Sequence, residues 1–264
     1  MSTLITALVV SGMIGAASST PWNTWATSDE GRPGHIDHST WQVMLNRYLD
    51  ARHRSGIARF RYAEVTPAHR ALLAGYVTTL TSIDPRDYAR AEQKAYWINL
   101  YNARTALFVI DNPDVDSIRD IRPHWFSSGP WGVKDLRIGD DEVSLDDIEH
   151  RILRPLFGDR RIHYALNCAS LGCPDLSAKV FTGKNVEMRL AAAEEAFVNH
   201  PRAVRFDGEV LVLSSLYDWY RDDFAPNERT LLDYLADHHL KLGDRLRAHT
   251  GAIRYEYDWA LNRP

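Results

Sequence analysis

The feature that most constrains the fold of this chain is a long stretch without glycine or proline. Residues 86–111 contain neither residue type, and Asn112-Pro113 follows directly. The middle of the stretch, "AYWINLYNARTALFV" at residues 95–109, is mostly apolar. A helix that is apolar around its whole circumference has to be buried. The sequence therefore predicts a long buried helix that ends near residue 111.

Other periodic segments extend this prediction to a mixed fold. Helices are expected over residues 40–52, from Thr66-Pro67 onward, and over 144–157, 184–199, 214–224 and 229–249. Strands are expected over residues 131–138, 161–168 and 252–262, and residues 203–214 read as a hairpin with Asp207-Gly208 at the turn. We predict an α+β fold, a helix-rich single domain with a small, mostly antiparallel sheet in its second half.

Composition narrows the classes of function. The chain has 264 residues and 45% of them are hydrophobic, which is enough for the core of one large domain or two small ones. Its formal net charge is -4 and no dense basic stripe is present, so we expect no nucleic-acid partner. The G-x-S-x-G, Walker A and G-x-G-x-x-G motifs are all missing, which disfavours serine hydrolases, P-loop NTPases and dinucleotide enzymes.

The beginning of the chain resembles an export signal. "LITALVVSGMIGAASS" is an apolar run followed by small residues, although no Lys or Arg precedes it. We expect a signal peptide over residues 1–19, a linker or wrapping arm over 20–40 and a single domain over 41–264. The protein would then be periplasmic or secreted, without a membrane span in the mature chain. An N-terminal helix packed on the domain is the alternative.

Both cysteines lie in "HYALNCASLGCPDL", residues 163–176. Cys168 is expected where a strand ends and a turn begins, and a nearby imidazole would complete an activated nucleophile. His163 is the nearest histidine, but regular alternation in a strand would point it away from Cys168. Glu149 and His150 on the preceding helix are the other candidates for orienting group and base. Histidine before cysteine would require a permuted papain-like arrangement.

Three plainer interpretations of the cysteines stay open. Cys168 is small enough to be an ordinary buried core residue. An exported protein with two cysteines also favours a disulfide between Cys168 and Cys173. A metal site would need His163, both cysteines and His150 together, but this spacing matches no established zinc signature. We therefore expect neither a metal nor another cofactor.

Four polar residues are candidates for substrate binding: Asn99, Asn102, Asn167 and Ser170. Asn99 and Asn102 lie three residues apart and share one face of the long helix. Amides on so apolar a helix need partners, which are either a substrate or the backbone of an irregular loop. The aromatic segments at residues 215–224 and 255–262 leave a similar choice between a ligand cleft and the core, and we favour the core.

Four separate motifs together resemble one protein family. They are "AYWINLYNA" at 95–103, "VSLDDIEHRILRP" at 143–155, "RIHYALNCASLGCPDL" at 161–176 and "YDWALN" at 257–262. In this order they are similar to the DUF547 family, a domain of unknown function, over roughly residues 60 to 262. The resemblance implies a DUF547-like domain over 41–264 and assigns no activity.

Two classes of function follow from these residues. The first is a thiol-dependent hydrolase or acyltransferase that uses Cys168 as nucleophile, with His163 or His150 as base. The second is a non-catalytic binding module in which "NCASLGCP" is structural or a disulfide loop. Either would act on a small-molecule or peptide ligand whose identity the sequence does not give.

Overall fold

The computed structural model describes residues 20–32, 34–125 and 127–264, so the expected signal peptide at residues 1–19 lies outside the described residues. The central element is α3, Arg90–Ile110, in which nearly every side chain from Glu92 to Val109 is buried. The predicted long buried helix is therefore confirmed. It begins after Pro85 because Asp84 caps a separate short 3-10 helix, η3, Pro85–Asp87.

Two predicted helices precede α3 in the chain and pack beside it. They are α1, Ser39–Tyr48, and α2, Pro67–Thr81. The Thr66 hydroxyl caps α2 by accepting from the His69 N–H at 3.3 Å, as expected for a helix that begins Thr-Pro. The chain between them forms the strand pair β1, Leu49–Asp50, and β2, Arg59–Phe60, followed by η2, Tyr62–Glu64.

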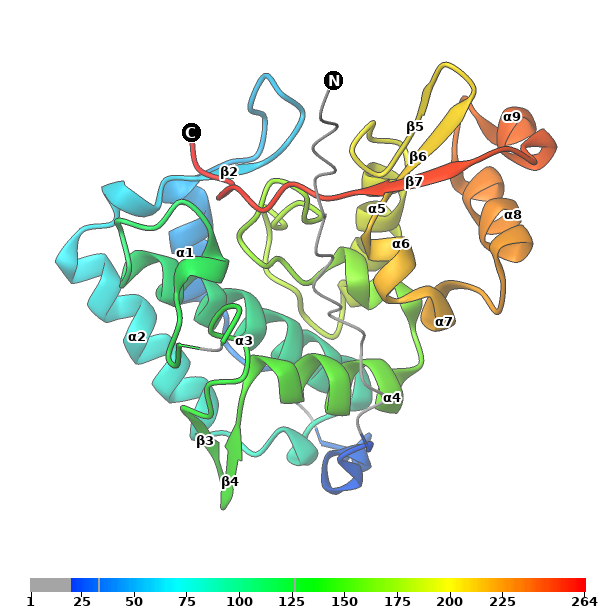
Figure 1. Ribbon diagram of the computed structural model, residues 1–264. Coiled ribbons are helices and arrows are strands. Elements are labelled where there is room, and N and C mark those ends of the chain that lie inside the picture. Colours follow the sequence, from blue (N-terminus) through cyan, green and yellow to red (C-terminus); the bar gives the residue numbers. More distant parts are fainter. Residues whose placement is uncertain (1–19, 33, 126) are drawn as a thin grey trace.

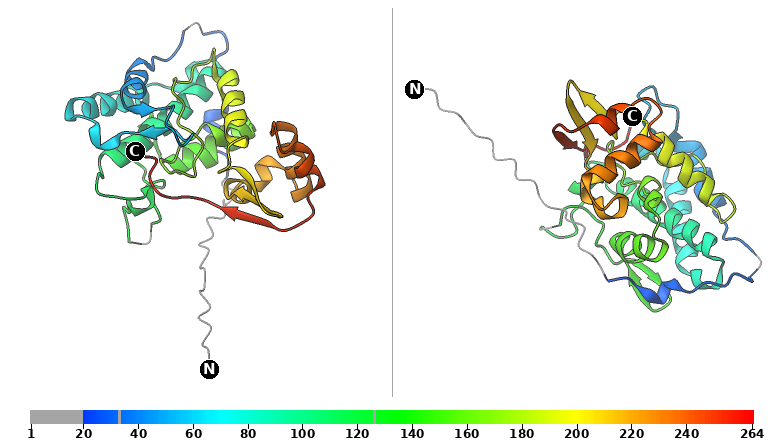
Figure 2. Two further views of the ribbon diagram at one scale, coloured as in Figure 1. Left: turned by 90° about the horizontal axis from the view of Figure 1, so that it is seen from above. Right: turned by 90° about the vertical axis from the view of Figure 1, so that its right-hand side faces the viewer.

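A second hydrophobic cluster lies beside the one around α3. It is built on α5, Val186–Val198, on α8, Glu228–His238, and on a small sheet. Figure 1 shows α1, α2 and α3 on the left and the sheet with α8 and α9 on the right, and the left view of Figure 2 shows the same separation from above. The C-terminal segment (red) crosses from the sheet back to β2.

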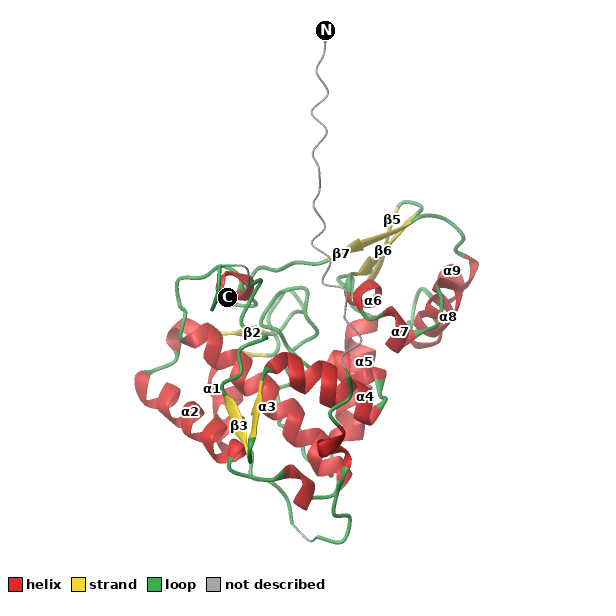
Figure 3. Cartoon of the chain, turned by 60° about the horizontal axis from the view of Figure 1, so that its bottom comes forward, coloured by secondary structure: helices red, strands yellow, loops and turns green. Residues whose placement is uncertain are grey.

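The sheet of the second cluster contains the predicted hairpin. β5, Val204–Asp207, pairs antiparallel with β6, Val210–Ser214, and Gly208 has the positive φ of 58° that the tight turn requires. β7, Ile253–Glu256, adds to β6 in parallel. A further antiparallel pair joins β3, Leu136–Ile138, to β4, Asp141–Val143. Figure 3 shows how short the strands are beside the helices, which confirms the helix-rich α+β prediction.

Several predicted helices are present in a divided form. The helix at residues 144–157 has a π-helical middle, η5, Asp147–Leu153, which continues as α4, Arg154–Phe157. The stretch 214–224 contains α6, Leu216–Trp219, and α7, Arg221–Phe224. The stretch 229–249 contains α8 and α9, Gly243–Ala248. Short 3-10 helices also lie at η1, Asn23–Ala26, and η4, Ile118–Asp120.

The strand predicted over residues 161–168 is wrong. This segment begins with a 3-10 helix, η6, Arg160–Tyr164, and continues as an irregular loop. Asp159 caps η6 by accepting from the Arg161 N–H at 3.0 Å, and it also binds the Arg161 guanidinium. Such local bonding between a side chain and the backbone competes with strand pairing. The apolar residues of this segment are instead divided between two clusters. Ile162 and Leu166 pack in the cluster around α3, the first cluster, and Tyr164 packs in the second.

The segment predicted as a linker or wrapping arm lies along the domain. The indole of Trp25 is buried and meets the Trp97 indole edge-on, with ring centroids 5.5 Å apart. The Trp22 N–H donates to the Arg151 carbonyl at 2.9 Å. None of the helices in the described ranges has the length and apolar character needed to cross a membrane.

Candidate active site

A cavity of about 300 Å³ lies where segments of both hydrophobic clusters meet. Its wall brings together all four residues that the sequence nominated for catalysis: Glu149, His150, His163 and Cys168. They come from the helix over residues 145–157, from η6 and from the loop after it. The cavity is closed by residues 127–132 and by aromatic side chains from α6 and the C-terminal segment.

The π-helix η5 carries one side of the cavity. The helix over residues 145–157, which contains η5, is capped at its start, because the Ser144 N–H donates to the Asp147 carboxylate at 3.0 Å and the Asp147 N–H donates to the Ser144 hydroxyl at 3.1 Å. Asp146, Glu149 and His150 all line the cavity from this helix. A π-turn is a rare local geometry that occurs often at functional sites.

Glu149 is a buried carboxylate that the surrounding groups keep ionised. The Tyr101 hydroxyl donates to its Oε2 at 3.1 Å, and the Tyr220 hydroxyl binds the same carboxylate. Burial raises the pKa of Glu149, but His150, His163 and the Tyr220 hydrogen bond outweigh it, so that its pKa lies below the usual value. A negative charge is therefore present in the cavity wall at neutral pH.

His163 is held between two acidic side chains. Its Nε2 lies 2.6 Å from Asp223 Oδ2, and its Nδ1 lies 3.9 Å from Glu149 Oε1. Arg154 donates to the same Asp223 oxygen at 2.5 Å. Partial burial raises the pKa of Asp223, but the bonds from His163 and Arg154 dominate and hold it well below its usual range.

The Nδ1 atom of His163 has no hydrogen-bond partner in the described structure, although the side chain is 1% exposed. A buried imidazole nitrogen without a partner is costly. No hydrogen bond joins His163 to Cys168. The imidazole and the thiol line the same cavity.

His150 occupies the outer part of the same wall. Its Nδ1 lies 3.0 Å from the Arg154 guanidinium, and its Nε2 lies 3.8 Å from Asp146 Oδ1. The ring also stacks on Tyr220 at a centroid distance of 6.0 Å. Because Asp223 lies against His163 instead, His163 is the better oriented imidazole of the two.

The Cys168 sulfur is surrounded by hydrogen-bonding groups. It lies 2.7 Å from the Cys173 sulfur, 3.1 Å from the Tyr257 hydroxyl and 3.1 Å from the Ser170 hydroxyl. Burial raises the pKa of the Cys168 thiol, but the bonds from Cys173, Ser170 and Tyr257 outweigh it and lower this pKa to about 7. Burial and the neighbouring Cys168 raise the pKa of Cys173 well above its usual value. Of the two thiols, Cys168 is therefore the one that ionises more readily.

Both cysteines are free thiols, so the structure contains no disulfide between them. The Cys173 thiol instead acts as a local partner. The Cys168 N–H donates to the Cys173 sulfur at 2.9 Å, and the two sulfur atoms lie within hydrogen-bonding distance of each other. The disulfide expected as one alternative from the sequence is not formed.

The backbone beside Cys168 is strained. Ala169 has a φ of 62°, and among the described residues it is the one non-glycine residue with positive φ. The Asn167 side chain accepts from the Ala169 N–H at 2.9 Å, and the Ala169 carbonyl accepts from the Asn262 N–H at 2.9 Å. This conformation costs an L-residue about 1–2 kcal/mol. Such strain is found most often where function requires a particular geometry.

The four residues nominated for substrate binding do not line the cavity. Asn99 binds both backbone groups of Phe181, donating to its carbonyl at 2.8 Å and accepting from its N–H at 3.1 Å. Asn102 does the same for two residues of the cysteine loop, with bonds to Ala165 O at 2.9 Å and from Asn167 N at 2.8 Å. Their observed partners are backbone groups of irregular segments, and substrate binding stays a prediction for them.

Asn167 and Ser170 support the cysteine loop from inside. Asn167 donates to the Pro174 carbonyl at 2.8 Å, which closes the loop around Cys173. The Ser170 hydroxyl binds the Cys168 sulfur and the Tyr257 hydroxyl. The first residue fixes the path of the loop, and the second contributes to the charge on Cys168.

Reasoning from the sequence missed several cavity residues. Asp223, which binds the cavity residue His163 from outside the cavity wall, was not singled out, and the aromatic segments were expected in the core. The structure divides those segments: Tyr217, Phe224 and Leu261 are core residues, whereas other rings line the cavity, namely Trp219, Tyr220, Tyr257 and Trp259. The alternation of acidic and aromatic residues in "YDWYRDDF" and "YDWALN" was the available signal.

The family model described as "Protein of unknown function, DUF547" matches residues 85–198. This match confirms the resemblance drawn from the motifs, and it contains α3, η5, η6 and both cysteines. The "YDWALN" motif lies outside the matched residues. No curated protein and no solved structure matches the chain.

Proposed function

We propose that this chain, which carries a DUF547 region over residues 85–198, is a thiol-dependent hydrolase or acyltransferase with Cys168 as nucleophile. The observation that carries the proposal is the environment of the Cys168 sulfur. A cavity-lining thiol with a pKa of about 7 is substantially ionised at neutral pH, and the thiolate is the nucleophilic form.

His163 is the proposed general acid and base. Asp223 accepts from Nε2–H, which leaves the lone pair on Nδ1 free to take a proton. The resulting imidazolium would lie between the carboxylates of Asp223 and Glu149, which stabilise its charge. No hydrogen bond joins the imidazole to Cys168, so a water bound between them would carry the thiol proton to Nδ1 of His163. His163 would then pass that proton to the leaving group.

The reaction has two balanced steps. The first step starts from the Cys168 thiolate and a His163 imidazolium whose Nδ1 carries the former thiol proton. The thiolate attacks an acyl carbonyl carbon, the C–S bond forms, and the bond to the leaving group breaks as that group takes the Nδ1 proton of His163. Water, or an acceptor alcohol or amine, then loses a proton to His163 Nδ1 and attacks the thioester. This second step releases the acid or the transferred acyl product and restores the thiolate.

Alkylation with iodoacetamide as a function of pH, read by mass spectrometry, tests the proposal. Cys168 should be half-reactive near pH 7, whereas Cys173 should stay unreactive until far higher pH. Incubation with p-nitrophenyl acetate should leave one hydroxylamine-labile acetyl group on Cys168. His163→Gln should slow both acetylation and deacylation, while Cys173→Ala should leave the site of acetylation unchanged.

The aromatic wall of the cavity favours a second candidate, a non-catalytic binding module. If Cys168 stays unreactive up to pH 9 and no acetyl-thioester forms, the catalytic proposal is wrong. Binding would then be the remaining role of the cavity.

We also propose that the protein acts in the periplasm or outside the cell. The support is the apolar run near the beginning of the sequence, followed by small residues.

A further inference from the structure

The cavity wall carries acidic side chains and two histidines. Two carboxylates line it, Glu149 and Asp146, while no Lys or Arg is among the described residues of its wall. Glu149 is buried and ionised. Asp146 is about half exposed, and its partial burial raises its pKa above the usual value. The thiolate proposed at Cys168 adds a further negative charge. A substrate with a free carboxylate close to its acyl group would be repelled.

Four aromatic rings form the wall on the side of Cys168. Trp219 and Trp259 stack with centroids 5.5 Å apart, and Tyr257 meets both, at 4.7 and 4.6 Å. Trp131 meets Trp259 edge-on at 6.0 Å. All four side chains are partly exposed and line the cavity. We call this group the ring cluster.

The ring cluster lies beside both the nucleophile and a carboxylate. The Tyr257 hydroxyl is one of the groups that bind the Cys168 sulfur. The Asp146 backbone N–H donates to the Trp131 carbonyl at 3.0 Å, and the Asp146 carboxylate lies next to Gly132, where a Cβ would be 3.5 Å from its Oδ2. The face of Trp259 already attracts a cation, because the Arg119 guanidinium lies 5.0 Å from its ring centroid. Aromatic faces next to carboxylates are the chemistry by which proteins bind ammonium groups.

We propose that the cavity binds acyl substrates that carry an ammonium group, primary or quaternary, and that this group lies against the ring cluster near Asp146. The inference rests on the proposed function for the identity of the reacting group, while the preference for a cation rests on the cavity wall alone. Neutral sugars and uncharged peptides would also stack on the rings, but they would not gain from the carboxylates.

Thiosulfonate reagents of similar size and different charge test this preference at Cys168. The thiolate attacks the reagent, forms a mixed disulfide and releases methanesulfinate, whatever the charge of the side group. We expect the trimethylammonioethyl reagent to react at least about tenfold faster than the sulfonatoethyl reagent, after each rate is divided by its rate with a small free thiol at the same pH. The Cys173→Ala variant limits the labelling to one cysteine.

Two substitutions distinguish the contribution of the Asp146 carboxylate to this preference from that of the aromatic rings. Asp146→Asn and Trp259→Leu should each lower the normalised ratio, whereas Asp244→Asn, at a fully exposed side chain on α9, should leave it unchanged. A normalised ratio near one would contradict the inference and point to a neutral ligand. Faster reaction of the anionic reagent would contradict it directly.

Slow reaction with the neutral methyl reagent would contradict the proposed nucleophile without deciding the cation preference. In that case tryptophan fluorescence decides it, with choline as the probe and its uncharged isostere 3,3-dimethyl-1-butanol as the control. Quenching by choline at concentrations at least about tenfold below those needed for the isostere supports the inference. Equal responses overturn it.

Discussion

Cys168 shows how hydrogen bonds from neighbouring side chains can lower the pKa of a thiol. Its sulfur is in a buried position that alone would favour the neutral thiol. Three neighbouring donors reverse this preference, and one of them is the second cysteine. Because Cys173 has the raised pKa, it keeps its proton and can donate it as a hydrogen bond. The two cysteines therefore differ in role: Cys168 is the thiol that ionises, and Cys173 is a hydrogen-bond partner that keeps its proton.

At the residue scale we predict that Tyr257→Phe raises the pKa of Cys168 from about 7 toward the usual value of about 8.5. The substitution removes the hydroxyl at 3.1 Å from the sulfur and keeps the ring. Iodoacetamide alkylation as a function of pH measures the change. Tyr255→Phe is the matched control. Tyr255 lies on the same C-terminal segment as Tyr257, but its hydroxyl accepts a hydrogen bond from Arg221. A midpoint that stays at pH 7 in Tyr257→Phe would contradict the assignment of donors.

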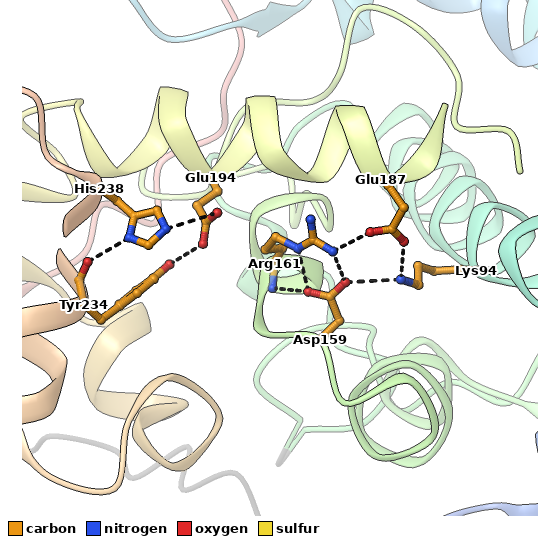
Figure 4. A network of polar contacts seen from close by, with 7 residues as sticks. All are labelled: Lys94, Asp159, Arg161, Glu187, Glu194, Tyr234 and His238. Carbon is orange, nitrogen blue, oxygen red and sulfur yellow. Dashed lines mark hydrogen bonds and ion pairs between the residues drawn. The ribbon is translucent and has the colours of Figure 1, made fainter. Parts of the chain in front are cut away.

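At the scale of elements, a polar network outside the cavity links the helices that position the site. Figure 4 shows Lys94 of α3 bridging Asp159 and Glu187, at 3.2 and 2.7 Å, with Arg161 of η6 bound to the same two carboxylates. Farther along α5, Glu194 accepts from the Tyr234 hydroxyl of α8 at 2.7 Å. The network thereby joins α3, η6, α5 and α8 around the segment that carries His163.

We predict that Asp159→Asn destabilises the fold by about 1–3 kcal/mol at neutral pH, because Lys94 and Arg161 lose a charged partner in a mostly buried place. Burial raises the pKa of Asp159, but Arg161 and Lys94 lower it to about 2, below its ordinary 3.8. The carboxylate therefore stabilises the folded state above about pH 4, and this contribution is lost as the pH falls toward 2. The difference in unfolding free energy between parent and variant should shrink over that interval in urea titrations.

Asp237→Asn is the control for this prediction. Asp237 also pairs with an arginine, at 2.6 Å from Arg247, but both side chains are largely exposed. An exposed pair contributes at most about 1 kcal/mol. If the two variants unfold alike at pH 7 and pH 3, the network does not stabilise the fold as proposed.

At the scale of the whole molecule, the C-terminal segment connects the two hydrophobic clusters. β7 belongs to the sheet of the second cluster, and Leu261 is buried in the first. Between them, residues 257–260 run past the cysteine loop, where the Gly172 N–H donates to the Asp258 carbonyl at 2.8 Å. A Cβ on Gly172 would come within 2.9 Å of the Tyr257 ring, so only glycine allows this approach. Residues distant in sequence thereby complete the cavity.

The location of the protein is a prediction at the same scale. If the apolar run is a signal peptide, mature protein recovered from its native host should begin near residue 17 to 20. N-terminal sequencing measures this directly. Protein from the cytoplasm that still carries Met1 or Ser2 would contradict export.

The sequence by itself determined the elements whose formation depends on local pattern. The apolar run around Trp97 required a buried helix, Thr66-Pro67 marked a helix start, and Asp207-Gly208 marked a hairpin turn. These signals are short-range, so they do not depend on what the segment packs against. The four residues nominated for catalysis lie within two short motifs, and they line one cavity; their catalytic role stays a prediction.

Only the tertiary structure decided how those residues relate to one another. Residues 161–168 alternate like a strand, yet the apolar positions alternate between two clusters and Asp159 caps a 3-10 helix, so the segment is a loop. Asp223 and Tyr257 reach the site from 60 and 89 positions away. Their bonds set the state of His163 and Cys168 through distances of a few ångströms in space, which no spacing along the chain encodes.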